Sequence, residues 1–311
     1  MEVPDMYVGI DIGSISAKLV ISGEDGSILY SDYRYHRGEP SGAVGSLCRS
    51  AREAGFARYR AMCVTGSGRN FIGEVLCADL VKNEITATWE ATRVLLPEAG
   101  SIIEIGGQDS KLISLENGEI SDFRLNSVCA AGTGSFIEQQ SNRLGITPME
   151  LSALAQMAER PARFTGRCTV FVETEMINLQ QRGWSVESIA AGLFEAVCEN
   201  YLNDLGSGMK ITGPVMFCGG VSEMEAMRLA FSRRLQMEVI VPSANRVAAA
   251  YGASVLASRA TRPAPERELP ERVAPPDRPL RPCDGRDCLT CGLCYTKRPS
   301  RLSGGPFPGS G

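Results

Sequence analysis

A strand, a glycine turn and a second strand follow one another twice in this chain. The first copy reads YVGIDIGSISAKLVI and the second reads SIIEIGGQDSKLISL. Each copy continues into Asp25-Gly26 or Asn117-Gly118, dipeptides typical of tight hairpin turns. The glycines of the first copy, Gly13 and Gly26, are thirteen residues apart, and those of the second, Gly106 and Gly118, are twelve apart. We predict one architectural unit used twice; two unrelated hairpins are the alternative.

Helical and strand patterns fill the rest of the chain. Strands that alternate with helices indicate an α/β fold. The expected strands are 61–65, 214–218 and 237–241, and the expected helices are 40–54, 84–96, 133–144, 148–158, 168–182, 185–206, 222–235 and 246–259.

The repeat divides the chain into two lobes and a C-terminal extension. We expect a first lobe of residues 1–97 plus 246–259 and a second lobe of residues 98–245. After residue 259 the sequence is rich in Pro and Arg, which is typical of an extended linker. The expected parts of the extension are a linker at 260–282, a cysteine box at 283–298 and a disordered tail at 299–311.

Charge and composition exclude several classes of protein. The net charge of -4 and the pI near 5.4 argue against a nucleic-acid-binding surface. No apolar stretch is long enough to span a membrane, and the N-terminus lacks the features of a signal peptide. We therefore expect a cytoplasmic protein, whose eleven cysteines serve metal binding, redox chemistry or core packing rather than disulfides. His36, the single histidine, is expected at the surface, so a catalytic serine–histidine pair is excluded.

The first glycine turn has the composition of a phosphate site. In DIGSISAK, Gly13 and Ser14 can direct backbone N–H groups at phosphate oxygens. Asp11 can hold a magnesium ion through water, and Lys18 adds a positive charge. Ser16, in the same turn, is a further expected nucleotide contact.

The second turn, GGQDSK, offers Gly106 and Gly107 for the same purpose. Gln108 or Asp109 can orient an attacking water, since phosphoryl transfer depends mainly on positioning and charge stabilisation. We predict Asp11, Gln108 and Asp109 as catalytic residues. Two further glycine-rich turns, AAGTGSF and FCGGVSE, precede helices, whose N-termini favour anions. The remaining expected nucleotide contacts are Gly132, Thr133, Gly134, Gly219, Gly220 and Asn245.

These turns are neither a Walker A motif nor a dinucleotide-binding fingerprint. Their arrangement resembles that of the actin/sugar-kinase/Hsp70 ATPase superfamily. The resemblance implies two duplicated lobes with ATP in the cleft between them.

Cys129 lies just ahead of an expected helix and Cys168 begins another, and a thiolate at a helix N-terminus is stabilised by the helix dipole. Two cysteines cannot complete a four-cysteine iron–sulfur site, but a two-fold dimer supplies four. The alternative is that both are small buried hydrophobic residues.

Five motifs occur in order: GIDIGSISAKLVI, EIGGQDSK, CAAGTGSFIE, GRCTVFVETEMI and CGGV. Together they resemble the ATPase activators of 2-hydroxyacyl-CoA dehydratases and the matching subunits of benzoyl-CoA reductase. The resemblance covers residues 6–258. It implies a dimer of identical or related subunits, with one [4Fe–4S] cluster held by Cys129 and Cys168 of each. It also implies hydrolysis of ATP with Mg²⁺ to drive one low-potential electron onto an acyl-CoA dehydratase or reductase, with ferredoxin or flavodoxin as donor. The chain departs from the family at Ser222-Glu223, where activators commonly carry Ala-Lys.

The extension carries four cysteines, Cys283, Cys288, Cys291 and Cys294, in the pattern C-x4-C-x2-C-x2-C. This spacing favours a second iron–sulfur cluster, with zinc as the alternative and an unligated segment as a third possibility. Such a box could act as an electron port for the central cluster. The remaining cysteines are expected in the core: Cys48, Cys63, Cys77, Cys198 and Cys218.

Two other functions compete with a redox ATPase. A small-molecule kinase of the same superfamily needs an acidic base facing a substrate pocket and no iron. A nucleotide-dependent scaffold needs neither redox chemistry nor rapid turnover. Cys129 and Cys168 favour the redox ATPase over both.

Overall fold

The structure is a computed structural model, and it describes residues 5–126, 132–165, 169–259 and 265–274. The chain divides into a compact unit, Met1–Pro275, and a C-terminal unit, Pro276–Gly311. All described residues belong to the first unit. The C-terminal cysteine box, Cys129 and Cys168 lie outside the described residues.

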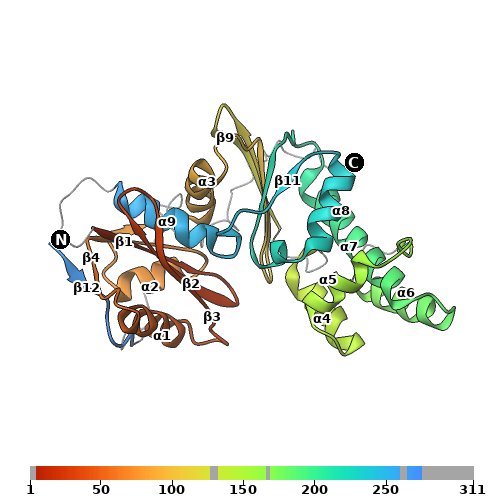
Figure 1. The fold of residues 1–311 in the computed structure, drawn as a ribbon, viewed down its shortest axis with the longest axis horizontal. Coiled ribbons are helices and arrows are strands. Elements are labelled where there is room, and N and C mark those ends of the chain that lie inside the picture. The colour runs from red at the N-terminus through yellow and green to blue at the C-terminus, as the bar shows by residue number, and fades with distance from the viewer. Residues whose placement is uncertain (1–4, 127–131, 166–168, 260–264, 275–311) are drawn as a thin grey trace, which may run out of the picture. The chain divides into compact units, whose positions relative to one another are not determined.

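Two five-stranded sheets form the framework of the first unit (Figure 1). The first has the order β3-β2-β1-β5-β6 and consists of β1 (Met6–Ile12), β2 (Ser16–Gly23), β3 (Ile28–Tyr35), β5 (Ala61–Thr65) and β6 (Leu80–Val81). The second has the order β9-β8-β7-β10-β11 and consists of β7 (Ser101–Ile105), β8 (Ser110–Glu116), β9 (Glu119–Asn126), β10 (Val215–Cys218) and β11 (Val239–Ile240).

The two sheets repeat one plan. In each, the central strand pairs antiparallel with the next strand of a three-stranded meander and parallel with a later strand on its other side. The Asn117-Gly118 turn has positive φ at both residues, 54° and 79°, as a two-residue hairpin turn of the I′ type requires. The predicted duplication and α/β class are therefore confirmed.

Helices cover the sheets. On the first sheet, alternate residues of β1 and β2 face opposite sides: Ile10 and Leu19 belong to the core cluster that includes residues of α1, while Val20 belongs to the cluster that includes residues of α9. The helices are α1 (Pro40–Glu53), α2 (Arg69–Val75), α3 (Glu84–Leu95), α4 (Gly134–Leu144), α5 (Pro148–Gln156), α6 (Thr169–Gln181), α7 (Val186–Tyr201), α8 (Glu225–Leu235) and α9 (Ala248–Ser258). Short helical turns are a π-helix at Leu202–Gly206 and 3₁₀ turns η3 (Gly220–Glu223) and η4 (Asn245–Val247).

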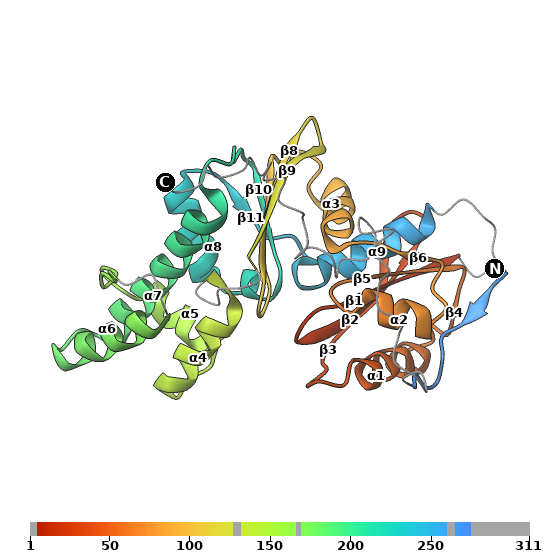
Figure 2. The same ribbon diagram turned by 180° about the vertical axis from the view of Figure 1, so that it is seen from behind.

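A shared apolar cluster lies between the two sheets. It combines Val20 of β2 with Ile102 of β7 and Met216 of β10, and it is completed by residues of α3 and α9 such as Ile85 and Tyr251. Figure 2 shows α3 and α9 in this position from the other side. Because one buried cluster takes residues from both sheets, the sheets pack into a single unit.

Local chemistry explains where several helices begin. Thr147 and Glu150 form a capping box at α5, whose first residue is Pro148. Asn83 caps α3 by accepting a hydrogen bond from the Thr86 N–H. Among the described helices, none combines the length and apolar character that a bilayer crossing requires.

Three sequence expectations need correction. Helix α2 was not predicted, because RNFIGEV is short and begins without a side-chain cap. Cys77 is exposed rather than part of the core, since it lies in a turn with φ of 48° just after α2. The predicted helix at 222–235 begins at Glu225, because Gly220–Glu223 form a 3₁₀ turn first.

Part of the expected linker is packed against the first sheet. Strand β12 (Arg267–Glu268) pairs antiparallel with β4 (Arg58–Tyr59), and Leu269 is only 1% exposed in the cluster that α1 shares with β1 and β2. The Leu269 N–H donates to the Ala57 carbonyl at 2.8 Å, and the Arg52 guanidinium donates to the Leu269 carbonyl at 2.6 Å. Residues 265–274 therefore belong to the folded unit.

Replacing Leu269 by Ala tests this anchoring. A fully buried leucine typically contributes about 2–4 kcal/mol, so we expect Leu269→Ala to lower the free energy of unfolding by that amount in urea denaturation. Glu271→Ala is the matched control, because the Glu271 side chain is 79% exposed. Equal stability of the two variants would mean that residues 265–274 act as a free linker.

Candidate functional site

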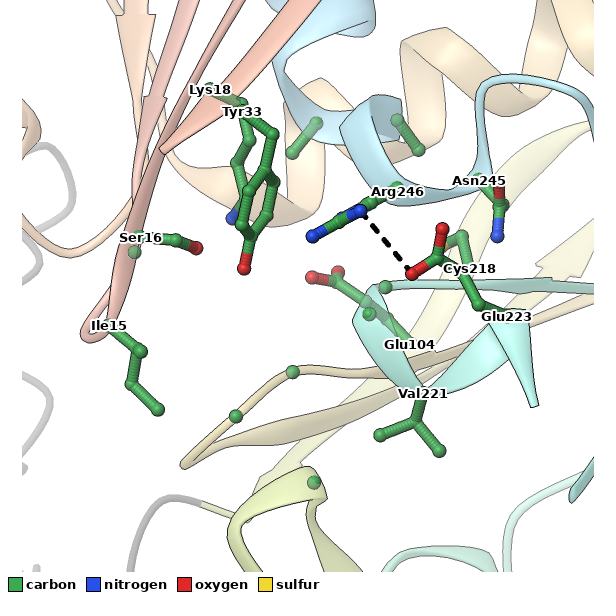
Figure 3. Close-up of a pocket in the computed structure, with 18 of the residues that line it drawn as sticks. Ile15, Ser16, Lys18, Tyr33, Glu104, Cys218, Val221, Glu223, Asn245 and Arg246 are labelled. Atoms are coloured by element: carbon green, nitrogen blue, oxygen red, sulfur yellow. Dashed lines mark ion pairs between the residues drawn. The ribbon is translucent and has the colours of Figure 1, made fainter. Parts of the chain in front are cut away.

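A cavity of about 390 Å³ collects most of the predicted nucleotide contacts (Figure 3). Its walls come from the turns of both repeats, from the ends of α3 and α4, and from η3 and η4. The volume lies within the range of small-molecule sites. The predicted residues that line the cavity are Asp11, Gly13, Ser14, Ser16, Lys18, Gly106, Gly107, Asp109, Gly134, Gly219, Gly220 and Asn245.

Three predicted residues do not line this cavity. Gln108 is exposed at the tip of its turn, and Gly132 and Thr133 are buried beside α4. Of the two residues proposed to orient water, Asp109 is therefore the one at the cavity. Among the described residues, no group of three or more His, Cys, Asp or Glu side chains is arranged to hold a metal ion.

The two glycine turns have the same internal hydrogen bond. The Gly13 N–H donates to the Ser16 carbonyl and the Gly106 N–H donates to the Asp109 carbonyl, both at 2.9 Å. In this structure the Gly13 N–H therefore closes the hairpin, and its contact with phosphate stays a prediction. Ser14 and Gly107, the next residue in each turn, line the cavity, and no partner from the described chain is recorded for their N–H groups.

Gly107 brings the two turns together. A Cβ atom at Gly107 would collide with the Ile15 side chain, which lies at the tip of the first hairpin. A side chain at position 107 would therefore force the Ile15 side chain to move, because the tip of the first hairpin lies against the second turn.

Asp11 and Lys18 form a buried ion pair on the wall of the first sheet. Lys18 Nζ lies 2.7 Å from Asp11 Oδ2, and the two residues face each other in the β1–β2 register. Burial alone would lower the pKa of Lys18, but the carboxylates of Asp11 and Glu84 hold it above its ordinary value. The other oxygen, Asp11 Oδ1, is buried with no hydrogen-bond partner, so this carboxylate fits a water-bound magnesium ion.

A second charge cluster surrounds Lys111, which is 3% exposed. Its Nζ lies 3.1 Å from Glu84 Oε1, 3.1 Å from Glu104 Oε1 and 3.0 Å from Asp109 Oδ2. The sequence analysis did not select Glu84, Glu104 or Lys111. A signal was present, because Glu104 and Lys111 each interrupt an otherwise buried apolar strand, and such charges are rarely buried without a partner.

The cluster has more carboxylates than cations, and this affects Glu104. Burial raises the pKa of Glu104 to about 8; Glu84 and Asp109 add to the increase, while Lys111 opposes it. The same three carboxylates hold the pKa of Lys111 well above its ordinary value, although burial opposes them.

On the opposite wall, Arg246 lies between Tyr33 and Glu223 (Figure 3). Its guanidinium carbon is 3.9 Å from the centre of the Tyr33 ring, and its Nη1 is 3.6 Å from Glu223 Oε2. The acidic residue at 223, which departs from the pattern of the activators, therefore faces a cation supplied by η4. The contact joins β3 of the first sheet to η3 beside the second.

Gly219 and Asn245 shape the turn after β10. Gly219 has φ of 88°, and a Cβ atom there would collide with the Ile105 carbonyl. The Gly219 N–H donates to the Asn245 carbonyl at 2.9 Å, and the Asn245 amide donates to Ser222 Oγ at 2.7 Å. Asn245 therefore lines the cavity and also holds the glycine turn in place through these two hydrogen bonds.

Helix α4 is attached directly to the second glycine turn. The Gly134 N–H donates to the Gly106 carbonyl at 2.9 Å, and the Ser135 N–H donates to the Gly107 carbonyl at 2.8 Å. The hydroxyl of Ser135 also donates to the Gly107 carbonyl. The N–H groups of Gly134 and Ser135 therefore bind this turn, and anion binding at the start of α4 stays a prediction.

The raised pKa of Glu104 predicts the direction in which folding stability changes with pH. The unfolded chain releases this proton near the ordinary glutamate pKa of about 4.3, whereas the folded chain keeps it to about 8. The folded state binds more protons in this window, so its stability falls as pH rises from 5 to 8. Glu104→Gln removes the titration, and we expect its stability relative to the wild type to rise by up to a few kcal/mol across this window.

Urea denaturation at a series of pH values measures the difference. Glu116→Gln is the control, since the Glu116 side chain is 66% exposed. Parallel stability curves for the wild type and Glu104→Gln would contradict the prediction.

Comparison with known proteins extends these findings. The 2-hydroxyisocaproyl-CoA dehydratase activator of Clostridioides difficile is 31% identical over 258 residues, covering 81% of this chain and 95% of the relative. The (R)-2-hydroxyglutaryl-CoA dehydratase activating ATPase of Acidaminococcus fermentans is 28% identical over 252 residues, which cover 80% of this chain and 96% of the relative. A solved structure of the Clostridium difficile activator with bound ADPNP is 28% identical and has a TM-score of 0.75, covering 82% of this chain and 94% of that one.

The structural similarity confirms the expected ATPase-type α/β architecture of the described residues. The sequence profile of one family matches residues 8–257, which include both glycine turns and the attachment of α4. The chain therefore belongs to the BadF/BadG/BcrA/BcrD ATPase family.

Proposed function

We propose that this protein is an ATP-hydrolysing activator that passes single low-potential electrons to an acyl-CoA dehydratase or reductase. The proposal includes one iron–sulfur cluster shared by two copies of the chain, or by this chain and a related subunit. The observation that carries it is the attachment of α4 to the second glycine turn, because α4 begins five residues after Cys129 in the sequence. The names of the relatives support the partner class: they are activators of acyl-CoA dehydratases.

The cavity supports the first part of the proposal, the binding and hydrolysis of ATP. Ser14 and Gly107 offer backbone donors to the phosphates, and Lys18 and Asp11 offer a cation and a magnesium-binding carboxylate. Asp109 and Glu84 place carboxylates at the same cavity, where either can orient an attacking water. A structural neighbour binds ADPNP, a nucleotide of the matching class.

The attachment of α4 to the second glycine turn supports the second part of the proposal, the coupling of the nucleotide site to the cluster. Two main-chain hydrogen bonds and the Ser135 hydroxyl hold the start of this helix to Gly106 and Gly107. Any shift of the turn when nucleotide binds or its γ-phosphate leaves must therefore move the start of α4. Cys129 lies five residues before Gly134 in the sequence, so we expect the same movement to affect this cysteine.

Helix α6, which follows Cys168, is joined to α4. The Arg143 guanidinium at the end of α4 forms an ion pair with Glu173 in the first part of α6. The two helices that follow the predicted cluster cysteines are thus linked to each other and, through α4, to the glycine turn.

Cys129 and Cys168 are the residues that would hold the cluster, with the same pair from the second subunit completing the four ligands. When bound, the cluster supplies a one-electron carrier whose potential depends on solvent exposure and on hydrogen bonds to sulfur. The role of this chain is to change those surroundings when its nucleotide changes. A ferredoxin or flavodoxin is the donor that fits a single electron.

The C-terminal box of Cys283, Cys288, Cys291 and Cys294 is a separate proposed metal site. An iron–sulfur cluster and a zinc ion remain the two candidates, since both take four thiolates. The match to the family ends at residue 257, so this site is an addition to the shared architecture.

Counting metal in anaerobically purified protein tests both sites. We expect Cys129→Ser to lose the iron and sulfide of the shared cluster while it still binds Mg-ADPNP, because the proposed nucleotide contacts are other residues. Cys77→Ser is the matched control, since Cys77 is exposed and far along the chain from either site. A chain ending at residue 274 loses only the iron, or the zinc, of the C-terminal box.

Two results would count against the proposal. Iron content equal in Cys129→Ser and Cys77→Ser would remove the shared cluster. Wild-type protein that is colourless, iron-free and monomeric but hydrolyses ATP would favour a kinase or a scaffold instead.

Breaking the contact between α4 and α6 tests the coupling. Arg143→Ala should leave ATP hydrolysis near its wild-type rate but lower the number of electrons transferred per ATP several-fold. The measurement compares phosphate release with reduction of a low-potential dye by the same sample. Arg233→Ala is the control, because it removes a similarly exposed ion pair, with Glu195, that lies between α7 and α8. The same electron yield from both variants would show that the ion pair carries no coupling.

A further inference from the structure

His36 lies immediately after β3 and contacts the first glycine turn. The sequence analysis expected a surface residue, but His36 is half-buried, and its Nε2 lies 3.1 Å from the Gly13 carbonyl oxygen. On the other side of the ring, the Gly38 N–H donates to Nδ1 at 3.1 Å. The chain turns back sharply to make this second contact, with φ of 48° at Arg37 and 87° at Gly38.

The two contacts define the tautomer of the ring. A backbone N–H can only donate, so Nδ1 of His36 must be an acceptor and carry no proton. In a neutral imidazole the proton is then on Nε2, which donates to the Gly13 carbonyl. The Gly38 N–H thus selects the form of the ring that holds Gly13.

Holding this carbonyl also sets the direction of the next N–H group. The Gly13 C=O and the Ser14 N–H belong to one planar trans peptide and point in opposite directions. Two further bonds fix the turn: the Gly13 N–H donates to the Ser16 carbonyl, and the His36 N–H donates to the Ile15 carbonyl at 3.0 Å. With its carbonyl held on the side of His36, this peptide directs the Ser14 N–H away from the imidazole.

We infer that His36 is a positioning residue, which orients the Ser14 N–H toward a phosphate group of the bound nucleotide. The inference rests on the proposed nucleotide site, since Ser14 and Gly13 line that cavity. His36 itself does not line it but lines a smaller neighbouring hollow with Ser14, Ile15 and Glu138. It therefore acts on the ligand through the peptide and not by contact.

A purely structural role for His36 makes a different prediction. A ring that only supports the loop between β3 and α1 would affect folding stability and would weaken all ligands of the cavity alike. A ring that orients one phosphate donor affects ligands that carry phosphate and leaves the nucleoside unaffected.

The test compares Mg-ADPNP with adenosine in calorimetric titrations of the full-length protein. We expect His36→Ala to weaken the binding affinity for ADPNP by about tenfold, the equivalent of about 1.4 kcal/mol, and to leave the affinity for adenosine unchanged. His36→Gln places an amide donor near the position of Nε2 and should restore most of the affinity. His36→Asn, whose shorter amide cannot reach the Gly13 carbonyl, should behave like His36→Ala.

Nitrogen NMR of the wild-type protein gives an independent readout, because the only histidine produces one pair of imidazole signals. We expect an unprotonated Nδ1 and a protonated Nε2. The opposite tautomer would overturn the inference, and so would equal ADPNP affinity in wild type and His36→Ala or a parallel loss for adenosine. A wild-type protein that does not bind ADPNP would overturn the proposed nucleotide site itself, an outcome that the wild-type titration alone identifies. If His36→Ala does not fold, the comparison of the Gln and Asn variants and the NMR signals still decide the question.

Discussion

The buried ammonium group of Lys111 connects more of this structure than any other charge described here. Its Nζ contacts α3 through Glu84, β7 through Glu104 and the second glycine turn through Asp109. Its backbone carbonyl accepts the hydroxyl hydrogen of Tyr201, which ends α7 and is fully buried. Burying a lone cation would cost several kcal/mol, so the lysine and its carboxylates stabilise the fold only as a set. The position of the second glycine turn, the start of α3 and the end of α7 therefore depend on one another.

The same strands that form the framework also supply the chemistry of the site. In each repeat, the hairpin that builds the sheet ends in the turn that faces the cavity, and the second turn continues through main-chain hydrogen bonds into α4. The link between the second glycine turn and α4 therefore includes main-chain groups, which are short and stiff. The proposed coupling relies on this stiffness, because it requires a small displacement at the turn to reach the helix.

Short-range patterns in the sequence were sufficient to predict most of the framework. The Asp25-Gly26 and Asn117-Gly118 turns and the apolar patterns of strands and helices are local features, and the structure has these turns and the starts of α3 and α5 where expected. The glycine turns also indicated the cavity correctly. What was missed depends on contacts between distant segments. In the sequence, Glu84 has the pattern of an ordinary residue at a helix N-terminus. Its role in the charge cluster depends on Lys111 of β8, which only the folded structure brings beside it.

The sequence also did not show which backbone N–H groups form hydrogen bonds within the protein. Gly13 and Gly134 are the residue types that a phosphate site needs, but their N–H groups close a hairpin and hold a neighbouring turn. Cys77 lies in an apolar stretch and yet is exposed, because the chain turns there with a positive φ. Leu269 stands in a Pro- and Arg-rich stretch whose composition gave no sign of its burial.

The contact between Gly107 and Ile15 has a consequence for how this site tolerates change over evolutionary time. On the proposal that backbone N–H groups bind phosphate, many side chains at position 14 are compatible with the same chemistry. At position 107, by contrast, a Cβ atom would collide with Ile15 Cδ1, so even a methyl group requires the Ile15 side chain to change its conformation. A substitution at position 107 is therefore coupled to the side chain at position 15, although both turns present the same kind of atom to the cavity.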